Sequence, residues 1–404
     1  MHHVSDDQRR ARLATRHALA PSARVETVEA ATTAVTVMHA TEPATVYLSY
    51  WARVNAVSFD DIDRAFYTDR SLVRQLAMRR TLFVFPRELL PAVLPSASAR
   101  VATTERTRMA KDLVSVGVTD DGHAWLDRAR DEILGLLATV PNGLTALEVR
   151  QAVPMLDISV VTPTATWGAP RVLTLLGAAG DVVRATNTSH WRTARLRWTL
   201  PNHWLGENRL GEEGPALDAT SGYREIVRRW LYSFGPGTEA DLVWWLGATK
   251  SIVRTALAEL NAVEVSLDGG GTGWLLPNDL DDVATPDPWV ALLPVLDPTV
   301  MGWQARDFYL GPHSDQVFEA RGNAGTTAWV DGRVVGCWIH TESGAVQVSL
   351  LEPVSDSARQ ALDAEAQRLT EWLDGERVAT GYMSPAMKAA TRALRAGDGS
   401  DIAQ

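Results

Sequence analysis

The chain is poor in cysteine and in lysine, and both shortages limit what it can do. Its 404 residues include a single cysteine, Cys337, which excludes an internal disulfide and a cysteine-based metal cluster. Only three of the 39 basic residues are lysine (Lys111, Lys250 and Lys388), and the other 36 are arginine. Genomic base composition is the simplest explanation of this bias, although guanidinium groups also match the geometry of phosphate.

Long apolar runs and metal-binding spacings are also missing. No segment approaches the length of a transmembrane span, and the first residues do not follow the pattern of a signal peptide. We therefore expect a cytoplasmic protein with no membrane partner. The nine histidines are scattered, and none has a second histidine four residues away beside an acid. We expect no metal ion and no other cofactor.

The net charge of −10 is unevenly distributed along the chain. Residues 1–110 contain 15 arginines and 11 acidic residues, a balance of +4, so the remaining residues carry −14. The overall acidity argues against a protein that coats nucleic acid. The basic amino-terminal part still allows one local anion-binding face.

Residues 35–54, VTVMHATEPATVYLSYWARV, have the pattern of two helices joined at a polar corner. Pro43 has a fixed φ angle and no N–H, so it suits the first turn of the second helix, and Thr41 suits the N-cap before it. The corner therefore presents His39 and Thr41 beside the start of a helix. Such residues are more often caps or core-edge residues than catalysts, and the pattern alone leaves both roles open.

Helix–turn–helix patterns followed by strands occur three times along the chain. The expected elements are helices over 58–66 and 71–78 with a strand over 79–86; helices over 145–153 and 170–176 with a basic hairpin over 182–200; and helices over 223–234, 239–246 and 251–260 with strands over 263–267 and 273–276. Helix, turn, helix and strand in this order are typical of a winged helix.

The two ends of the chain have other patterns. Residues 5–19 predict a basic helix capped by Ser5, whose arginines either face solvent or contact phosphate. After residue 288, strands are expected over 289–295, 307–310, 326–330, 333–340 and 346–351, followed by a helix over 355–373. Asp331–Gly332 is a strong hairpin turn between two of these strands. The tail after Met383 is expected to be loosely ordered.

These patterns predict a mainly α protein with α+β parts, in which tandem winged helix-turn-helix units precede a small β-rich α+β domain. The predicted domains are a helical and winged-helix region with the corner (1–140), a second winged helix with a basic hairpin (141–205), a third winged helix (222–285) and a carboxy-terminal α+β domain (288–380).

The sequence resembles the AlkZ/YcaQ-like family of bacterial winged-helix DNA glycosylases over nearly its whole length. The matching segments are RRARLATRHAL, the corner with its following WARV, LVRQLAMRRTLFVFP, FGPGTEADLVWWLG, LLPVLDPTVMGW, GNAGTTAWVDGRVVGCW and DAEAQRLTEWL. The resemblance implies tandem winged helices and a β-rich domain around a concave DNA-binding surface. It also implies removal of bulky alkylated purines and the unhooking of interstrand crosslinks.

The catalytic motif of well-described family members is glutamine, an apolar residue, glutamine. Those glutamines fall on His39 and Thr41 of this chain, with Ala40 as the spacer. An N7-alkylated guanine is cationic and already a good leaving group, so an enzyme mainly has to hold a water near C1′ and stabilise an oxocarbenium-like sugar. Neutral His39 can both donate and accept a hydrogen bond, as can the Thr41 hydroxyl, and His39 can also act as a base near pH 7.

A carboxylate would strengthen this corner, and two residues are candidates to supply one. Glu42 is adjacent in sequence, and Asp297 lies in the family-like segment LLPVLDP. Arginines supply the candidate DNA contacts, because guanidinium groups bind phosphate. These are Arg79, Arg80, Arg192, Arg195, Arg197 and Arg306. A solvated wing edge, or a turn in the case of Arg306, is the alternative for each.

We therefore expect a DNA repair-type glycosylase that hydrolyses the N-glycosidic bond of alkylated, N7-substituted purines in duplex DNA, with crosslinked bases among its candidate substrates. It would be monofunctional, because a lyase step needs an amine nucleophile and no lysine lies near the corner. The expected partner is damaged duplex DNA without sequence preference, bound by a monomer associated with the nucleoid. The alternative is a non-catalytic winged-helix DNA-binding protein, either a lesion sensor or a transcription regulator. A protein-interaction module is a third hypothesis.

Overall fold

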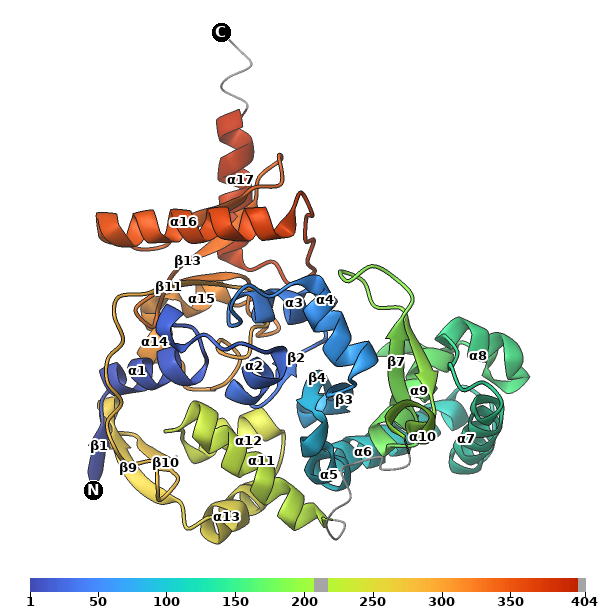
Figure 1. Ribbon diagram of the computed structural model, residues 1–404. Helices are drawn as coiled ribbons and strands as arrows, with labels where there is room; N and C mark the ends of the chain where they lie inside the picture. Colours follow the sequence, from blue (N-terminus) through green and yellow to red (C-terminus); the bar gives the residue numbers. More distant parts are fainter. Residues whose placement is uncertain (207–216, 399–404) are drawn as a thin grey trace. The chain divides into compact units, whose positions relative to one another are not determined.

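Helices account for about half of the described chain, and the strands form small sheets and hairpins (Figure 1). The computed structural model describes residues 1–206 and 217–398. Within these ranges, no helix combines the length and the apolar character that a bilayer span requires. The chain divides into two units. The first contains residues 1–62, 228–245 and 257 onward, and the second contains residues 63–227 and 246–256.

The first unit contains both ends of the described chain. Its helices are α1 (Asp6–Arg16), α2 (Val28–Ala34), α3 (Pro43–Trp51), α12 (Glu239–Leu246), α14 (Asp307–Leu310), α15 (Ser314–Val317), α16 (Asp356–Leu373) and α17 (Pro385–Asp398), and α4 (Phe59–Asp63) begins in it. Its strands are β1 (His2–Val4), β2 (Met38–His39), β9 (Val263–Leu267), β10 (Thr272–Leu275), β11 (Val290–Leu293), β12 (Thr327–Val330), β13 (Arg333–His340) and β14 (Val346–Leu350).

The amino-terminal helix α1 begins as predicted, with the Ser5 side chain accepting from the backbone N–H of Gln8. Its arginines, however, neither face solvent nor remain available to phosphate. The Arg9 guanidinium lies 3.6 Å from the ring centroid of Phe308, and Arg12 donates to Asp279 at 3.1 Å. Both arginines are buried. The basic stripe of this helix therefore stabilises the first unit from inside.

An antiparallel sheet in the order β11-β12-β13-β14 forms the carboxy-terminal part of this unit. Val330 pairs with Arg333 across a turn in which Asp331 and Gly332 both have positive φ angles. This is the two-residue hairpin that the sequence predicted. Helix α16 packs against β11 and β14, and α17 packs against β13 (Figure 1).

Two predictions for this part were wrong. Residues 307–310 form the short helix α14 rather than a strand, and its turn buries Phe308 and Tyr309 while the Tyr309 hydroxyl donates to the carbonyl of Val300 at 2.9 Å. Packing of the aromatic rings here outweighs their preference for strands. Residues 385–398 form helix α17 rather than a loose tail, because Met387 and Ala390 bury one face against Ile339. Residues 399–404 lie outside the described ranges.

The second unit is built on helices. These are α5 (Leu90–Val93), α6 (Ala99–Ser115), α7 (Gly122–Ala138), α8 (Ala146–Ala152), α9 (Ala169–Ala179) and α10 (Pro201–Leu205). Its hairpins are β3 (Leu72–Ala77) with β4 (Thr81–Pro86), β5 (Val160–Thr162) with β6 (Ala165–Trp167), and β7 (Val183–Asn187) with β8 (Leu196–Thr199). Its hydrophobic core lies mainly among α6, α7, α8 and α9. These four helices are neighbours in Figure 1.

The predicted helix over 71–78 is wrong, because residues 72–77 form strand β3 and pair with β4. Every residue of β3 is buried. A strand that is buried on both faces lacks the alternating pattern that distinguishes a strand from a helix. Polar Gln75 is accommodated there by donating to the carbonyl of Gly177 at 2.8 Å.

The elements predicted for the second helix–turn–helix pattern are present, but the hairpin β5–β6, which the sequence did not predict, lies between its two helices in the chain. Thr145 caps α8 and forms a capping box with Glu148, α9 follows, and β7 and β8 form the expected hairpin. The third pattern also has its predicted elements, with α11 (Ala219–Phe234), α12, α13 (Lys250–Glu259), β9 and β10 in order. Both α11 and α13 run from one unit into the other. The division into four domains stays a prediction.

Candidate functional site

The polar corner joins α2 to α3 through the short strand β2. Pro43 occupies the first turn of α3, as predicted. The N-cap is Glu42 rather than Thr41, and the Glu42 side chain makes no capping hydrogen bond. Because a proline at the first helical position places the cap on the residue before it, Thr41 falls one residue too early to cap the helix.

The three polar residues of the corner have different surroundings. His39 is buried, with 6% of its surface exposed. Thr41 is exposed, and Glu42 is half-buried. Three peptide units separate His39 from Glu42, so their Cα atoms lie within about 11 Å of one another. The corner therefore holds one buried imidazole and one half-buried carboxyl group close to the start of α3.

Asp297 lies in the first unit, in the segment after β11, and is fully buried. Its Oδ1 accepts from Arg53 Nη2 at 2.7 Å and from the Thr299 backbone N–H at 2.9 Å. Its Oδ2 accepts from Arg53 Nη1 and from the Ser49 hydroxyl, both at 2.9 Å. Both carboxylate oxygens are thus engaged twice by donors of the protein.

The pair of Asp297 and Arg53 belongs to a larger buried network. Arg53 also donates to the Thr299 hydroxyl at 2.8 Å, and His17 Nδ1 lies 2.9 Å from the same oxygen. Burial and the nearby Arg53 charge hold the pKa of His17 well below its ordinary value. A neutral His17 protonated at Nε2 can still donate to the carbonyl of Ser233 at 3.1 Å, while Nδ1 accepts from the Thr299 hydroxyl. The network connects α1, α3 and α11 around Asp297, and its geometry is that of a structural centre.

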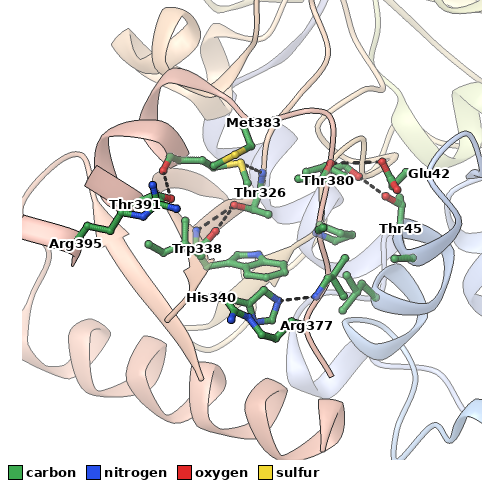
Figure 2. Close-up of a pocket in the computed structure, with 18 residues that line it drawn as sticks. Glu42, Thr45, Thr326, Trp338, His340, Arg377, Thr380, Met383, Thr391 and Arg395 are labelled. Carbon is green, nitrogen blue, oxygen red and sulfur yellow. Dashed lines mark hydrogen bonds between the residues drawn. The ribbon is translucent and has the colours of Figure 1, made fainter. Parts of the chain in front are cut away.

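Glu42 faces a pocket in the first unit instead. Figure 2 shows Glu42, Thr45 and Thr380 at one end of this pocket, Thr391 and Arg395 at the other, and Trp338 between them. The Glu42 carboxylate accepts from the Thr380 hydroxyl at 3.5 Å and from the backbone N–H of Gly381. Burial raises the pKa of Glu42, and these two neutral donors only partly offset the shift.

Arg306, a predicted DNA contact, is held inside the first unit. Its guanidinium lies 4.1 Å from the ring centroid of Phe318 and 4.9 Å from that of Trp244, and its Nε donates to the carbonyl of Trp303 at 2.8 Å. Burial lowers the pKa of Arg306. This arrangement fits the turn-holding alternative.

Arg79 and Arg80 lie in the turn of the β3–β4 hairpin, in the second unit. Both have positive φ angles, 53° and 57°, a left-handed conformation that non-glycine residues rarely adopt. Arg79 is half-buried, whereas half of the Arg80 side chain is exposed and its Nη1 lies 3.3 Å from Glu105. Arg80 is therefore the more accessible of the two for phosphate.

The three arginines of the β7–β8 hairpin also differ. Arg197 donates to the carbonyl of Gly143 at 2.6 Å, which ties the hairpin to the start of its own helical pair. Arg192 contacts His190 within the loop at 3.3 Å. Arg195 is exposed, and its backbone takes part in the loop: the N–H donates to the Asn187 side chain at 2.9 Å, and the carbonyl accepts from the Thr188 hydroxyl at 2.9 Å. The tip of the hairpin thus presents Arg192 and Arg195.

The residues that sequence reasoning missed belong to the pocket and to the buried network. Thr380 and Arg377 line the pocket from an irregular segment that follows α16, and no motif marks that segment. Arg53 offered a signal, since a lone arginine directly after an apolar helix often has a buried partner. Its partner Asp297 lies 244 positions away, and a separation of this size cannot be inferred from spacing.

With this geometry established, comparison with known proteins identifies the class. A model of the AlkZ-like DNA glycosylase family matches residues 32–372. The chain therefore belongs to the AlkZ-like DNA glycosylase family, and the resemblance seen in the sequence is confirmed.

Among solved structures, the chain is similar to the DNA glycosylase AlkZ of Streptomyces sahachiroi. The TM-score is 0.72 and the sequence identity is 19%, over 91% of this chain and 97% of that chain. This likeness shows a shared fold, with helices and small sheets mixed as described above. A comparison with curated proteins found no match.

Proposed function

We propose that the protein is a monofunctional DNA glycosylase that hydrolyses the N-glycosidic bond of N7-alkylated purines in duplex DNA. Family membership supports the reaction class and a DNA substrate. The observation that carries the proposal is Glu42, a carboxyl group held by neutral donors directly beside the corner where the family has its catalytic motif. The near absence of lysine supports a hydrolytic reaction without a covalent amine intermediate.

In this proposal His39 prepares the attacking water. A neutral imidazole has one donor and one acceptor nitrogen, so it can orient a water molecule toward C1′ and accept its proton as the bond forms. The leaving purine carries a positive charge before it departs and needs no acid. Thr41, which is exposed and does not cap α3, has a secondary role in contacting the sugar or phosphate.

Glu42 supplies the negative charge of the site. A carboxylate in a partly desolvated position interacts strongly with positive charge on the base and the sugar, because little water screens it. Asp297 is assigned a structural role, since its oxygens already accept four hydrogen bonds. It fixes α3 through Ser49 and Arg53 and so helps to position the corner at the start of that helix.

The DNA backbone would be contacted by the exposed arginines of the second unit. Arg80 and Arg195 are the candidates with the most accessible guanidinium groups, and Arg192 lies on the same hairpin tip as Arg195. Contacts of this kind are independent of sequence, as repair of scattered lesions requires. Each lost phosphate contact should reduce the slope of log K against log salt by about 1.

The test is base release from duplex DNA carrying N7-methylguanine or a bulkier N7 adduct. His39→Ala is expected to slow release by about 100-fold or more, the range of a lost general base. His3→Ala and Glu132→Gln are the controls, because both residues are exposed and neither belongs to the corner. Base release by His39→Ala at the wild-type rate would show that His39 is not the general base.

The burial of His39 also supports a second function, that of a non-catalytic DNA-binding protein. His39 is 94% covered in the folded chain, which suits a residue at the edge of the core as well as a catalyst. If neither the wild type nor the variants release base while all bind DNA with steep salt dependence, the protein is a non-catalytic lesion binder. A dimer that reads two half-sites would instead indicate a transcription regulator.

A further inference from the structure

Four arginines are buried within the described ranges, and one of them has no carboxylate as a partner. Three form ion pairs at 3.4 Å or less: Arg9 with Asp6, Arg12 with Asp279, and Arg53 with Asp297. The fourth is Arg74 on strand β3, which is 9% exposed and forms no ion pair with any described residue. Because a buried charge without a counter-ion is costly, the surroundings of Arg74 are those of an incomplete site.

Aromatic rings hold the Arg74 guanidinium in place. Its Cζ lies 3.9 Å from the ring centroid of Phe66 and 5.7 Å from that of Tyr67, and its Nη1 donates to the Tyr67 hydroxyl at 3.3 Å. Both rings belong to the π-helical turn Arg64–Thr68, which follows α4. Turns of this kind are uncommon and recur at functional sites. The rings fix the position of the guanidinium and reduce the cost of its charge, but they do not neutralise it.

A second arginine without a counter-ion lies nearby, on strand β7. Arg184 is half-buried and forms no hydrogen bond or ion pair with any residue in the described ranges. Its Cζ lies 4.3 Å from the ring centroid of Trp198, the residue opposite it on β8. Gly177 leaves room for this stack, because a Cβ atom there would lie 2.9 Å from Trp198 Cζ3. Arg184 is therefore held on an aromatic face with its N–H donors unused.

The two guanidinium groups belong to one unit and are close enough to repel each other. Strands β3 and β7 pack together in the second unit (Figure 1). Burial and the charge of Arg74 lower the pKa of Arg184, although a guanidinium stays protonated at neutral pH. The guanidinium nitrogens that lack a partner among the described residues remain open to solvent. An anion that contacts both groups would remove the repulsion and use these donors.

A phosphate group fits this set of donors. Guanidinium forks bind phosphate oxygens in pairs, and the tetrahedral oxygens of phosphate can engage two forks and a hydroxyl at once, whereas a carboxylate has two oxygens in one plane. The Tyr67 hydroxyl accepts from Arg74 and keeps its own O–H for a third contact. We propose that Arg74, Arg184 and Tyr67 form a binding site for one phosphate group.

Two sources of phosphate share this chemistry. One is a phosphodiester of the DNA backbone, an assignment that rests on the proposed function, and the other is a free phosphate ion, which is independent of it. The site differs from Arg80 and Arg195, whose side chains are more exposed. Because the stacked guanidinium groups lose little freedom on binding, a DNA contact here would also fix the position of the strand.

The first experiment measures the melting temperature of the full chain in sodium phosphate and in sodium chloride at equal pH and ionic strength. Bound phosphate should raise the melting temperature of the wild type by about 2–4 °C, because only the folded state has the site. Phosphate also stabilises proteins in general, since it is excluded from their surfaces. The rise is therefore compared between variants.

Arg184→Met is the test variant, because it keeps a long side chain over Trp198 and removes one of the two repelling charges. It should be at least as stable as the wild type in chloride and should lose the additional rise in phosphate. Arg128→Met is the matched control, since it removes an exposed arginine of α7 in the same unit. It should keep the additional rise.

The second experiment measures equilibrium binding of an undamaged DNA duplex over a range of sodium chloride concentrations. If the phosphate belongs to DNA, Arg184→Met should reduce the slope of log K against log salt by about 1, and Arg128→Met should leave the slope unchanged. Arg184→Lys keeps the charge and should preserve most of the slope, but it should bind more weakly because it lacks the guanidinium fork.

The results separate the two sources. A reduced slope for Arg184→Met assigns the site to the DNA backbone, and loss of the phosphate effect with an unchanged slope assigns it to free phosphate. If Arg184→Met responds to phosphate and to DNA as the wild type does, the proposal is overturned. An equal loss in Arg128→Met would also overturn it, because net charge alone would then explain the result.

The phosphate site and the proposed glycosylase activity can fail separately. If the wild type releases N7-methylguanine while Arg184→Met binds phosphate and DNA normally, the glycosylase function stands and the phosphate site is overturned. If no base is released but phosphate or DNA binding depends on Arg184, the phosphate site is supported and the catalytic proposal fails.

Discussion

Asp297 and Glu42 are carboxylates of the same unit with opposite surroundings. Asp297 is fully buried, yet Arg53 neutralises its charge and all of its hydrogen bonds come from nearby protein donors. Glu42 is half-buried, and among the described residues its side chain accepts hydrogen bonds only from the Thr380 hydroxyl and the Gly381 N–H. The difference shows that depth of burial and completeness of partners are separate properties of a carboxylate. Our proposal for Glu42 depends on the second property, because an incomplete set of partners leaves a charge that a ligand can satisfy.

The largest effect should come from breaking the Asp297 pair. Arg53→Met leaves the Asp297 charge buried without a cation, and we expect a loss of about 3–5 kcal/mol in the free energy of unfolding. The midpoint of urea denaturation, followed by circular dichroism, measures this change. The protein should still fold if its total stability exceeds the loss.

The control for this prediction removes both charges. The Arg53→Met and Asp297→Leu double variant replaces the pair by apolar groups of similar size and should recover most of the lost stability. If the single variant denatures at the wild-type midpoint, the pair does not carry the structural role assigned to it, and Asp297 becomes a candidate for catalysis again.

The second effect concerns Glu148, a carboxylate whose neutral donors are joined by an arginine, since Arg197 Nη2 lies 3.6 Å from Glu148 Oε1. Glu148 accepts from the Thr145 backbone N–H at 2.7 Å and from its hydroxyl at 2.9 Å. Thr145→Ala removes half of this capping box and should destabilise the second unit by about 1 kcal/mol. Thr103→Ala, on an exposed face of α6, is the control and should change stability by less than about 0.5 kcal/mol.

Local signals of this kind account for what the sequence could predict. The caps at Ser5 and Thr145, the proline at the start of α3 and the Asp331–Gly332 turn each depend on residues within four positions of one another. These features were predicted and found. Strand β3 was taken for a helix because its pairing partner, not its own pattern, decides its conformation.

The candidate site was less predictable for the same reason. The sequence placed His39 and Glu42 at a corner, but the pocket beside Glu42 also needs Trp338 from β13 and Thr380 from the segment after α16. Asp297 looked like a site residue because of its family-like segment. Its role depends on Arg53, which only the folded chain brings to it. Contacts between distant segments are set by tertiary packing, and spacing along one sequence does not encode them.

A third prediction uses pH to separate Glu148 from Glu42. The hydrogen bonds of the capping box hold the pKa of Glu148 below its ordinary value. Its contribution to stability is therefore present above the pKa of an unfolded glutamate and is lost as the pH falls through the lower, folded value. Glu148→Gln should have a lower free energy of unfolding than the wild type at neutral pH, and the difference should disappear in acid. A difference that does not depend on pH would mean that the charge of Glu148 does not contribute to the stability of this cap.

The carboxylate of Glu42 should change stability with pH in the opposite direction to that of Glu148, and this change should be the smallest of those predicted here. Burial raises its pKa, so the folded state favours the protonated form. The stabilising contribution of this preference is fully present below the pKa of an unfolded glutamate and is lost as the pH rises through the higher, folded value. Glu42→Gln should then be slightly more stable than the wild type at neutral pH and equal to it in acid. Tyr382 lies near this charge, but it does not ionise within that pH range.

Thermal unfolding of the wild type and of Glu42→Gln at neutral and at acidic pH tests this sign. A carboxylate that lowers the stability of the fold at neutral pH is retained at the expense of stability, as is common for functional groups. A variant that is less stable than the wild type at neutral pH would instead place Glu42 with Asp297 and Glu148, among the carboxylates that hold the fold together.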